Sequence, residues 1–331
     1  MNARTCRFTL AVLSLALLPL AFNSAPRSAT AESYPARPVK IILPYPPGGP
    51  GDAIARIVAQ KLSERLGGQF YVENLPGAGG TIGAGIAANA PADGYTLLLA
   101  NQDLVIQQFI KAKVPYDPFK SFAPVAQIVA APEMISVHPS LPAHSMKELI
   151  ALLRANPGKY SYASPGFGTS PHLACEWLFR LTYGLDVTHV PFQGGGPAVM
   201  STLSGQTPIL HIVLPAVAAH IKDGKLRPLA VASTKRSPFF PDLPTLEEAL
   251  LPGHEIGFWA GVMVPAGTPA GIVPRLHTEI AAMAALPDVK ERLATLGFDP
   301  AVDTPEAFAS LIASQSELWG KIVREANLKA E

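Results

Sequence analysis

Short apolar runs alternate along the chain with segments whose apolar residues recur every three or four positions. Val39–Leu43 is such a run and predicts a strand, and the periodicity from Asp52 onward predicts a helix with Asp52 as its N-cap. Residues 70–72 predict a second strand, residues 81–90 a helix, and residues 95–100 a third strand. Strands and helices that alternate at this spacing are typical of parallel strand–helix–strand units with right-handed crossovers.

The same pattern resumes after a proline-rich middle. Ser145 and Glu148 stand at the positions of a capping box, which predicts the start of a helix. Ser170 is predicted to be the N-cap of a later helix. Thr268 and Thr304, each followed by proline, are predicted to be the N-caps of two long C-terminal helices. Four short strands are predicted in this half, at residues 160–163, 187–190, 209–213 and 227–232.

The N-terminus has the sequence of an export signal. Arg4 and Arg7 provide positive charge, an apolar run covers residues 8–22, and residues 29–31 match the small-residue pattern that precedes a cleavage site. We therefore expect residues 1–31 to be a signal peptide cleaved near Ala31, and the mature protein to be periplasmic. A membrane anchor is the alternative, but the apolar run is shorter than the roughly 20 residues that a spanning helix needs.

Composition narrows the class of protein further. The 331 residues are 48% hydrophobic, which is enough for a large core, and the 27 glycines and 34 prolines are too few to indicate disorder. The formal net charge is +1 and lysine and arginine form no dense block, which argues against nucleic acid as a partner. Of the two cysteines, Cys6 lies in the predicted signal peptide. Cys175 would remain alone, so we expect no internal disulfide in the mature chain.

Three predicted strand-to-helix loops are rich in glycine: residues 46–51, 164–169 and 193–196. In a parallel α/β sheet such loops leave the carboxyl ends of the strands, where ligands bind. Their backbone N–H groups and the positive end of the following helix favour an anion, and glycine allows a close approach. Two such loops could hold a small carboxylate from both sides, although each loop could also be an ordinary tight connection.

Sequence motifs for catalysis or for metal binding are missing. The chain has no phosphate-binding G-x-x-x-x-G-K-[ST] loop, no G-x-S-x-G nucleophile elbow, no H-E-x-x-H and no paired C-x-x-C. Its eight histidines show no spacing that would place two on one helical face. The glycines of residues 75–83 do not follow the dinucleotide-binding pattern. We therefore expect a binding protein without cofactor or metal, and not an enzyme.

Nine segments, in order along the mature chain, resemble the Bug-type solute receptors of tripartite tricarboxylate transporters. They are residues 34–40, 44–52, 72–80, 93–98, 166–173, 190–198, 224–231, 241–245 and 265–269. The resemblance implies an α/β fold of the two-lobed periplasmic-binding-protein type (type II, Venus flytrap), in which each lobe is a mixed or parallel sheet flanked by helices. Lobe 1 would comprise residues 32–132 and 258–331, and lobe 2 residues 133–257.

The resemblance also implies the ligand-binding residues. A small carboxylate would lie in the cleft between the lobes, held largely by backbone amides and ordered water. The matching positions are Tyr45, Pro47, Gly48, Gly49, Asp52, Gly168, Thr169, Ser170 and His172. Asn101, Gln193 and His211 are further candidates. From the residues alone, Asp52 and Ser170 could instead serve only as helix caps, and His172 and His211 could be packing residues.

The function implied is that of an extracytoplasmic receptor, monomeric, which captures an organic acid and delivers it to the integral membrane permease of such a transporter. Two alternatives remain open: a periplasmic sensor that acts on a signalling receptor without its own permease, and a secreted enzyme on the same fold. After Gly205-Gln206 the family usually continues with a hydrophobic residue and an aspartate, but this chain has Thr207 and Pro208. The missing carboxylate favours an acid without an amino group.

Overall fold

The computed structural model describes residues 34–233, 235–250 and 256–329, all of which belong to one compact unit of the chain, Ala31–Glu331. The predicted signal peptide, residues 1–31, lies outside the described residues, and its cleavage stays a prediction. None of the helices in the described ranges is long and apolar enough to cross a membrane.

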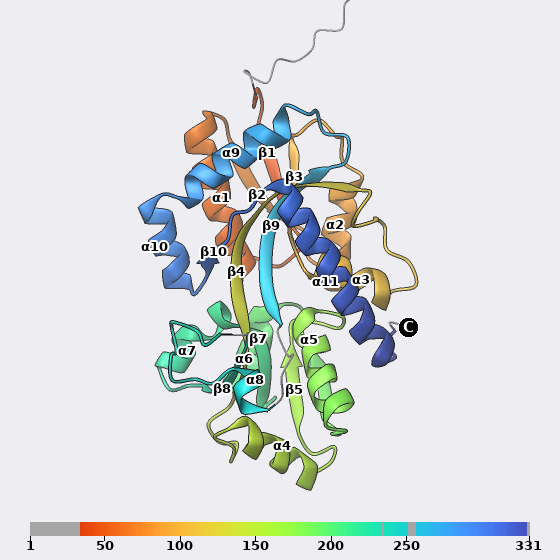
Figure 1. Ribbon diagram of the computed structural model, residues 1–331, viewed down its shortest axis with the longest axis vertical. Helices are drawn as coiled ribbons and strands as arrows, with labels where there is room; N and C mark the ends of the chain where they lie inside the picture. The colour runs from red at the N-terminus through yellow and green to blue at the C-terminus, as the bar shows by residue number, and fades with distance from the viewer. Residues whose placement is uncertain (1–33, 234, 251–255, 330–331) are drawn as a thin grey trace, which may run out of the picture. The chain divides into compact units, whose positions relative to one another are not determined.

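The described residues contain ten strands: β1 (Val39–Leu43), β2 (Phe70–Asn74), β3 (Thr96–Asn101), β4 (Phe122–Val137), β5 (Ser161–Ser164), β6 (Thr188–Pro191), β7 (Ile209–Val213), β8 (Arg227–Ala232), β9 (Gly257–Pro265) and β10 (Asp299–Pro300). They are hydrogen-bonded in the order β2-β1-β3-β9-β4-β7-β5-β6, with β8 and β10 also paired to β4 (Figure 1). Pairs within β1–β2–β3 and within β5–β6–β7 are parallel, as the alternation predicted, whereas β4 and β9 pair antiparallel to their neighbours.

Helices connect and cover these strands. They are α1 (Pro50–Leu66), α2 (Thr81–Ala88), α3 (Asp103–Ile110), α4 (Met146–Ala155), α5 (Ser170–Cys175), α6 (Gly195–Leu203), α7 (Ala218–Lys222), α8 (Leu246–Ala249), α9 (Ile272–Ala284), α10 (Pro287–Leu296) and α11 (Pro305–Glu325). A π-helix, Glu176–Thr182, continues α5, and two 3₁₀ turns lie at Ala78–Gly80 and Leu214–Ala216.

Strand β4 joins two sheets. Its first part, up to Pro132, pairs with β9, and from Glu133 onward it pairs with β7 and β8. The sequence pattern did not predict β4 or β9. Pro124 and Pro132 interrupt the apolar run of β4, yet the strand accommodates Pro124 at a register shift, where a ladder hydrogen bond is already lost. One strand therefore links the β1–β2–β3–β9 sheet to the β5–β6–β7–β8 sheet without a loop.

Two of the predicted helix caps are confirmed. Ser145 caps α4, since its Oγ accepts a hydrogen bond from the Glu148 amide at 3.2 Å, and Thr304 caps α11 by accepting from the Ala307 amide at 3.2 Å. The capping box at Ser145 is incomplete, because the Glu148 carboxylate accepts from the amide of His144 and not from that of Ser145.

Three predicted helix starts are wrong. Helix α1 begins at Pro50, with Gly49 as N-cap, so Asp52 lies inside the first turn; proline suits that turn because its missing N–H would be unpaired there. Thr169, and not Ser170, is the N-cap of α5. Helix α9 begins at Ile272, because Thr268 donates its hydroxyl to the carbonyl of Pro265 and closes a separate turn.

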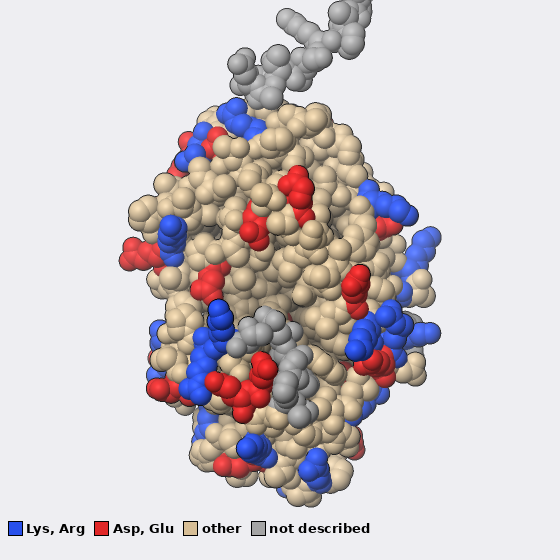
Figure 2. Space-filling model, viewed as in Figure 1, with Lys and Arg blue, Asp and Glu red and all other residues tan. Residues whose placement is uncertain are grey.

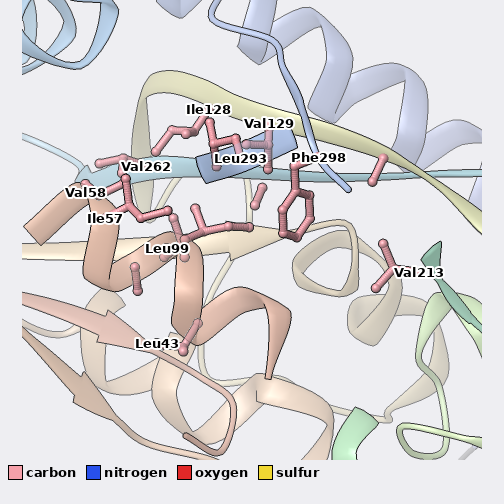
Figure 3. Packing of buried hydrophobic residues seen from close by; sticks show 14 of the residues in the cluster. Leu43, Ile57, Val58, Leu99, Ile128, Val129, Val213, Val262, Leu293 and Phe298 are labelled. Carbon is pink, nitrogen blue, oxygen red and sulfur yellow. The ribbon is translucent and has the colours of Figure 1, made fainter. Parts of the chain in front are cut away.

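The apolar core runs beneath the strands and reaches the cavity described below. Ile57 and Val58 of α1 are buried in the same cluster as Leu99 of β3 (Figure 3). Leu43 and Val213 belong to this cluster as well, one from each sheet. Because the residues at the ends of the strands are part of one packed core, the loops that follow them start from fixed positions.

Gly261 of β9 provides a test of this packing. A Cβ atom at this position would lie 2.3 Å from Cζ of Phe308 and 2.7 Å from the backbone oxygen of Ala126. The backbone oxygen belongs to the paired strand β4 and cannot shift as a flexible side chain could. We expect Gly261→Ala to lower the free energy of unfolding by about 1–3 kcal/mol in urea titrations. Gly257→Ala on the same strand, where the nearest atom is 3.9 Å away, is the control and should change it by less than about 1 kcal/mol.

Candidate ligand-binding site

A cavity of about 200 Å³ lies where the carboxyl ends of β1, β3, β5 and β6 meet. Its walls are the turns that follow these strands, the first turns of α1, α5 and α6, and apolar side chains of the core. Leu43, Leu99, Ile212, Val213 and Phe258 form the apolar part of the wall. The cavity thus combines exposed backbone at helix starts with a hydrophobic surface.

The structure brings most of the sequence-predicted site residues to this cavity. Those that line it are Tyr45, Pro47, Gly48, Gly49, Asp52, Asn101, Thr169 and Ser170. Gly168, His172, Gln193 and His211 do not line it, although each is the direct chain neighbour of a residue that does. The roles of all twelve residues in binding stay predictions.

Asp52 shapes the turn before α1. Its Oδ2 accepts hydrogen bonds from the Gly48 amide at 3.1 Å and from Nε of Arg56 at 2.8 Å, and its Oδ1 accepts one from Nδ2 of Asn74 at 3.0 Å. Burial by itself raises the pKa of Asp52, but these three hydrogen bonds outweigh it and hold the pKa below its ordinary value. The carboxylate is therefore used within the turn, which Gly48 closes with a positive φ of 83°.

Four glycine amides at the cavity wall have no partner among the described residues. The amides of Gly49 and Gly51 at the start of α1, and those of Gly195 and Gly196 at the start of α6, make no hydrogen bond to any described residue. First-turn N–H groups of a helix lack intrahelical partners and carry the positive end of its dipole. These two helix starts, one beside each sheet, offer free donors to an anion.

The turn before α5 differs from this arrangement. The Gly168 amide donates to Nδ1 of His172 at 3.1 Å, the Thr169 amide donates to the Gly166 carbonyl at 3.3 Å, and the Ser170 amide donates to Oδ1 of Asp103 at 3.0 Å. Sequence reasoning expected these amides to face a ligand, but each already has a partner inside the chain. Free amides on the second sheet come instead from the third glycine-rich loop, at Gly195 and Gly196.

Buried polar side chains form a network behind the turn. Nε2 of Gln102 donates to Oγ of Ser170 at 2.7 Å, and that hydroxyl donates to Oε1 of Glu133 at 2.5 Å. The Tyr45 hydroxyl donates to Oδ2 of Asp103 at 2.7 Å and also lies 3.0 Å from Oδ1 of Asn101. The network ties the loops after β1 and β3 to the start of α5.

Sequence reasoning missed Gln102, Asp103 and Glu133, all of which line the cavity. A signal was present for each of them. Gln102 and Asp103 directly follow an apolar strand, where polar residues reach a binding edge, and Glu133 is a single acid within an apolar stretch. Burying an acid is costly, so such an isolated acid indicates a site rather than a surface.

Burial is the main cause of the raised pKa values of Glu133 and Asp103. It raises the pKa of Glu133 to about 8, with a further contribution from the nearby Asp103, and the hydrogen bonds from Ser170 and Gln102 oppose the shift. It also raises the pKa of Asp103 to about 6, against hydrogen bonds from Tyr45, Ser170 and Asn101. At neutral pH Glu133 is therefore mostly protonated, whereas Asp103 is mostly ionised.

His172 is part of an aromatic stack. Its ring lies 4.0 Å from that of His189 and 4.8 Å from that of Phe167 between centroids, and His189 also stacks on Tyr162 at 4.9 Å. Burial lowers the pKa of His172 to about 2 and that of His189 to about 4, so both rings are neutral at physiological pH. His172 acts here by accepting the Gly168 amide and by packing.

Positively charged side chains are absent from the cavity wall. No lysine or arginine lines it, and the part of the chain that the structure describes contains no group of three or more histidine, cysteine or acidic residues that could hold a metal ion. On the face in Figure 2, acidic and basic side chains are scattered without a large patch of one sign. An anion in the cavity would therefore be held by N–H donors and not by side-chain cations.

Comparisons with known proteins agree with this fold. BugT of Bordetella pertussis is 36% identical over 302 residues, which cover 91% of this chain and 92% of that protein. The structure of R. palustris Rpa4515 with adipate is 32% identical and covers 90% of this chain and all of that one, with a TM-score of 0.86. MatC from Rhodopseudomonas palustris with bound malate is 30% identical and covers 88% of this chain and all of that one, with a TM-score of 0.80.

The fold and the cavity are those of a periplasmic solute-binding protein. The model of the tripartite tricarboxylate transporter family receptors (TctC) matches residues 54–328. The chain belongs to this family, whose members are periplasmic binding receptors and not enzymes. The resemblance to Bug-type receptors and the α/β binding-protein fold are both confirmed, and the alternative of a secreted enzyme is set aside.

The stabilising role of the Asp52 carboxylate in the turn at the start of α1 can be tested by its dependence on pH. Its pKa in the folded chain is below the ordinary value of 3.8, so its stabilising effect is fully present above that value and is lost as the pH falls below it. We expect Asp52→Asn to lower the free energy of unfolding at pH 7, and the difference from the unmodified protein to shrink below pH 3.8. Asp242→Asn, at an exposed aspartate, is the control; an equal effect of both substitutions would contradict this role.

Proposed function

We propose that this protein is a periplasmic receptor that captures a small carboxylate in the cavity and delivers it to the membrane permease of a tripartite tricarboxylate-type transporter. The observation that carries the proposal is the set of four unpartnered amides at Gly49, Gly51, Gly195 and Gly196. Relatives support the same ligand class, since Rpa4515 is described with adipate and MatC with malate. Residues 1–31 would direct export and then be cleaved off, and the receptor would act as a monomer.

Capture requires the two halves of the receptor to meet around the ligand. Lobe 1 would consist of residues 32–132 and 258–331, and lobe 2 of residues 133–257. The change of pairing partner along β4 at Pro132 and Glu133, and the start of β9 at Gly257, support this division. Free amides of α1 belong to the first lobe and those of α6 to the second, so a bound carboxylate gains contacts that exist only when the lobes are close.

Substitution of Gly49 tests the amide directly. Its φ of −85° is compatible with proline, and a Cβ there would meet nothing closer than 4.0 Å. We expect Gly49→Pro, which removes the N–H donor, to weaken binding of the best acid from a thermal-shift screen by about tenfold or more, as for a hydrogen bond to a charged group. Gly49→Ala keeps the donor and should bind within about threefold of the unmodified protein. Equal affinity of the two variants would refute the role of this amide.

The ligand itself can be identified by mass spectrometry of whatever co-purifies with the protein, followed by a thermal-shift screen of organic acids. If no organic acid binds, the proposed function is wrong.

Salt dependence gives an independent test. Because no lysine or arginine lines the cavity, binding releases few counterions and affinity should fall only modestly with ionic strength. Isothermal titration calorimetry at low and high salt should show less than about a threefold change in dissociation constant. A steep fall would indicate that cationic side chains hold the ligand, which contradicts the proposal.

A further inference from the structure

Two acidic side chains of the cavity have no lysine or arginine partner among the described residues. Of the three acids that line it, Asp52 is paired with Arg56 at 2.8 Å, but Asp103 and Glu133 contact no lysine or arginine among the described residues. Both are buried, with 5% and 1% of their surface exposed. A buried acid without a cation is uncommon, because removing the charge from water is not compensated.

One oxygen of Glu133 is buried without a hydrogen-bond partner. Its Oε1 accepts hydrogen bonds from Oγ of Ser170 at 2.5 Å and from Nε2 of Gln102 at 3.3 Å, whereas its Oε2 accepts none. Nε2 of His211 lies 3.4 Å from Oε2, and both ring nitrogens of this histidine are without hydrogen bonds. Burial lowers the pKa of His211 to about 3, so the ring is neutral and does not supply a positive charge.

We propose that the carboxylate taken by this cavity also carries a protonated amine, and that Asp103 and Glu133 receive that amine. This inference rests on the proposed function, since the carboxylate end would occupy the glycine amides. An ammonium group has three donors and one positive charge. Placed beside Asp103 and Glu133 at the cavity wall, it would neutralise acids that the chain itself leaves without a lysine or arginine.

This assignment differs from the expectation drawn from the segment after Gln206. That segment lacks the aspartate usual in the family, which favoured an acid without an amino group. The structure provides carboxyl groups from other elements, Asp103 at the start of α3 and Glu133 in β4. Because both line the cavity, the absence of an aspartate at position 208 does not deprive the site of an amine acceptor.

Binding of an amine should also release a proton. The titratable groups around Glu133 are Asp103 from α3, His211 from β7, Cys175 from α5 and, through Asp103, Tyr45. Burial raises the pKa of the Cys175 thiol and of Tyr45 well above their usual ranges, so both are neutral. Burial and Asp103 keep Glu133 mostly protonated in the free receptor at pH 7. An adjacent ammonium favours its ionised form and expels the proton, whereas a second carboxylate would retain it.

The test compares probes of equal carbon number. Hexanoate, adipate, 6-aminohexanoate and norleucine are titrated calorimetrically at pH 7 in two buffers of different ionisation enthalpy. We expect at least one of the two amino acids to bind about tenfold or more tightly than hexanoate and adipate, with net proton release. Hexanoate or adipate binding as tightly as both amino acids, or amino acid binding with proton uptake, overturns the inference. If non-amino acids bind and the amino acids do not, only this inference fails; if no acid of either kind binds, the proposed function fails too.

Glu133→Gln preserves the size of the side chain and an acceptor for Ser170 while removing the acid. We expect this variant to lose about tenfold or more in affinity for the amino acid and to abolish proton release, with less than about threefold change for hexanoate. Glu64→Gln, at a residue of α1 outside the cavity, is the matched control and should alter neither. An unchanged ratio of amino acid to hexanoate affinity in Glu133→Gln overturns the inference. If the variant does not fold, proton release on amino acid binding to the unmodified protein is the measurement that tests the inference.

Discussion

Backbone N–H groups at the first turn of a helix have no partner within that helix, and this constraint organises the site. The chain satisfies one of these donors itself, since Asp103 accepts the amide of Ser170, and Asp52 accepts the amide of Gly48 just before α1. Others, at the starts of α1 and α6, stay open at the cavity wall. Glycine occupies these positions, so no side chain stands between the donors and a ligand. Under the proposed function, selectivity for acids would therefore arise from the peptide groups that the chain leaves without a partner.

Much of the architecture could be predicted from the sequence. The strand at Val39–Leu43 and those at Ile209–Val213 and Arg227–Ala232 match their predicted bounds, because a short apolar run between glycine- or proline-rich turns has few other solutions. Strands β4 and β9 were not predicted. Their pairing is antiparallel and distant in sequence, and the prolines in β4 hide a strand that tolerates them only through a register shift. No local pattern carries that information.

The location of the candidate site could be predicted from the sequence, but its free amides and its unpaired acids could not. Glycine-rich loops after strands located the cavity, since the carboxyl ends of parallel strands meet at one edge. Which amides remain free was not predictable, because that depends on long-range partners such as Asp103 for Ser170. The acids Asp103 and Glu133 reach the same cavity from separate elements, and only the tertiary structure shows that neither has a cation beside it.

The continuity of β4 has a mechanical consequence. Where two halves of a protein are joined by flexible linkers, they can slide, tilt and turn in many directions. Here a single extended strand enters both sheets. Hydrogen bonds to β9 fix its first part, and hydrogen bonds to β7 and β8 fix its last part. A movement of the two proposed lobes relative to one another would therefore have to bend β4 near Pro132, where its pairing partner changes. A bend within a paired strand allows fewer directions of movement than a flexible linker does.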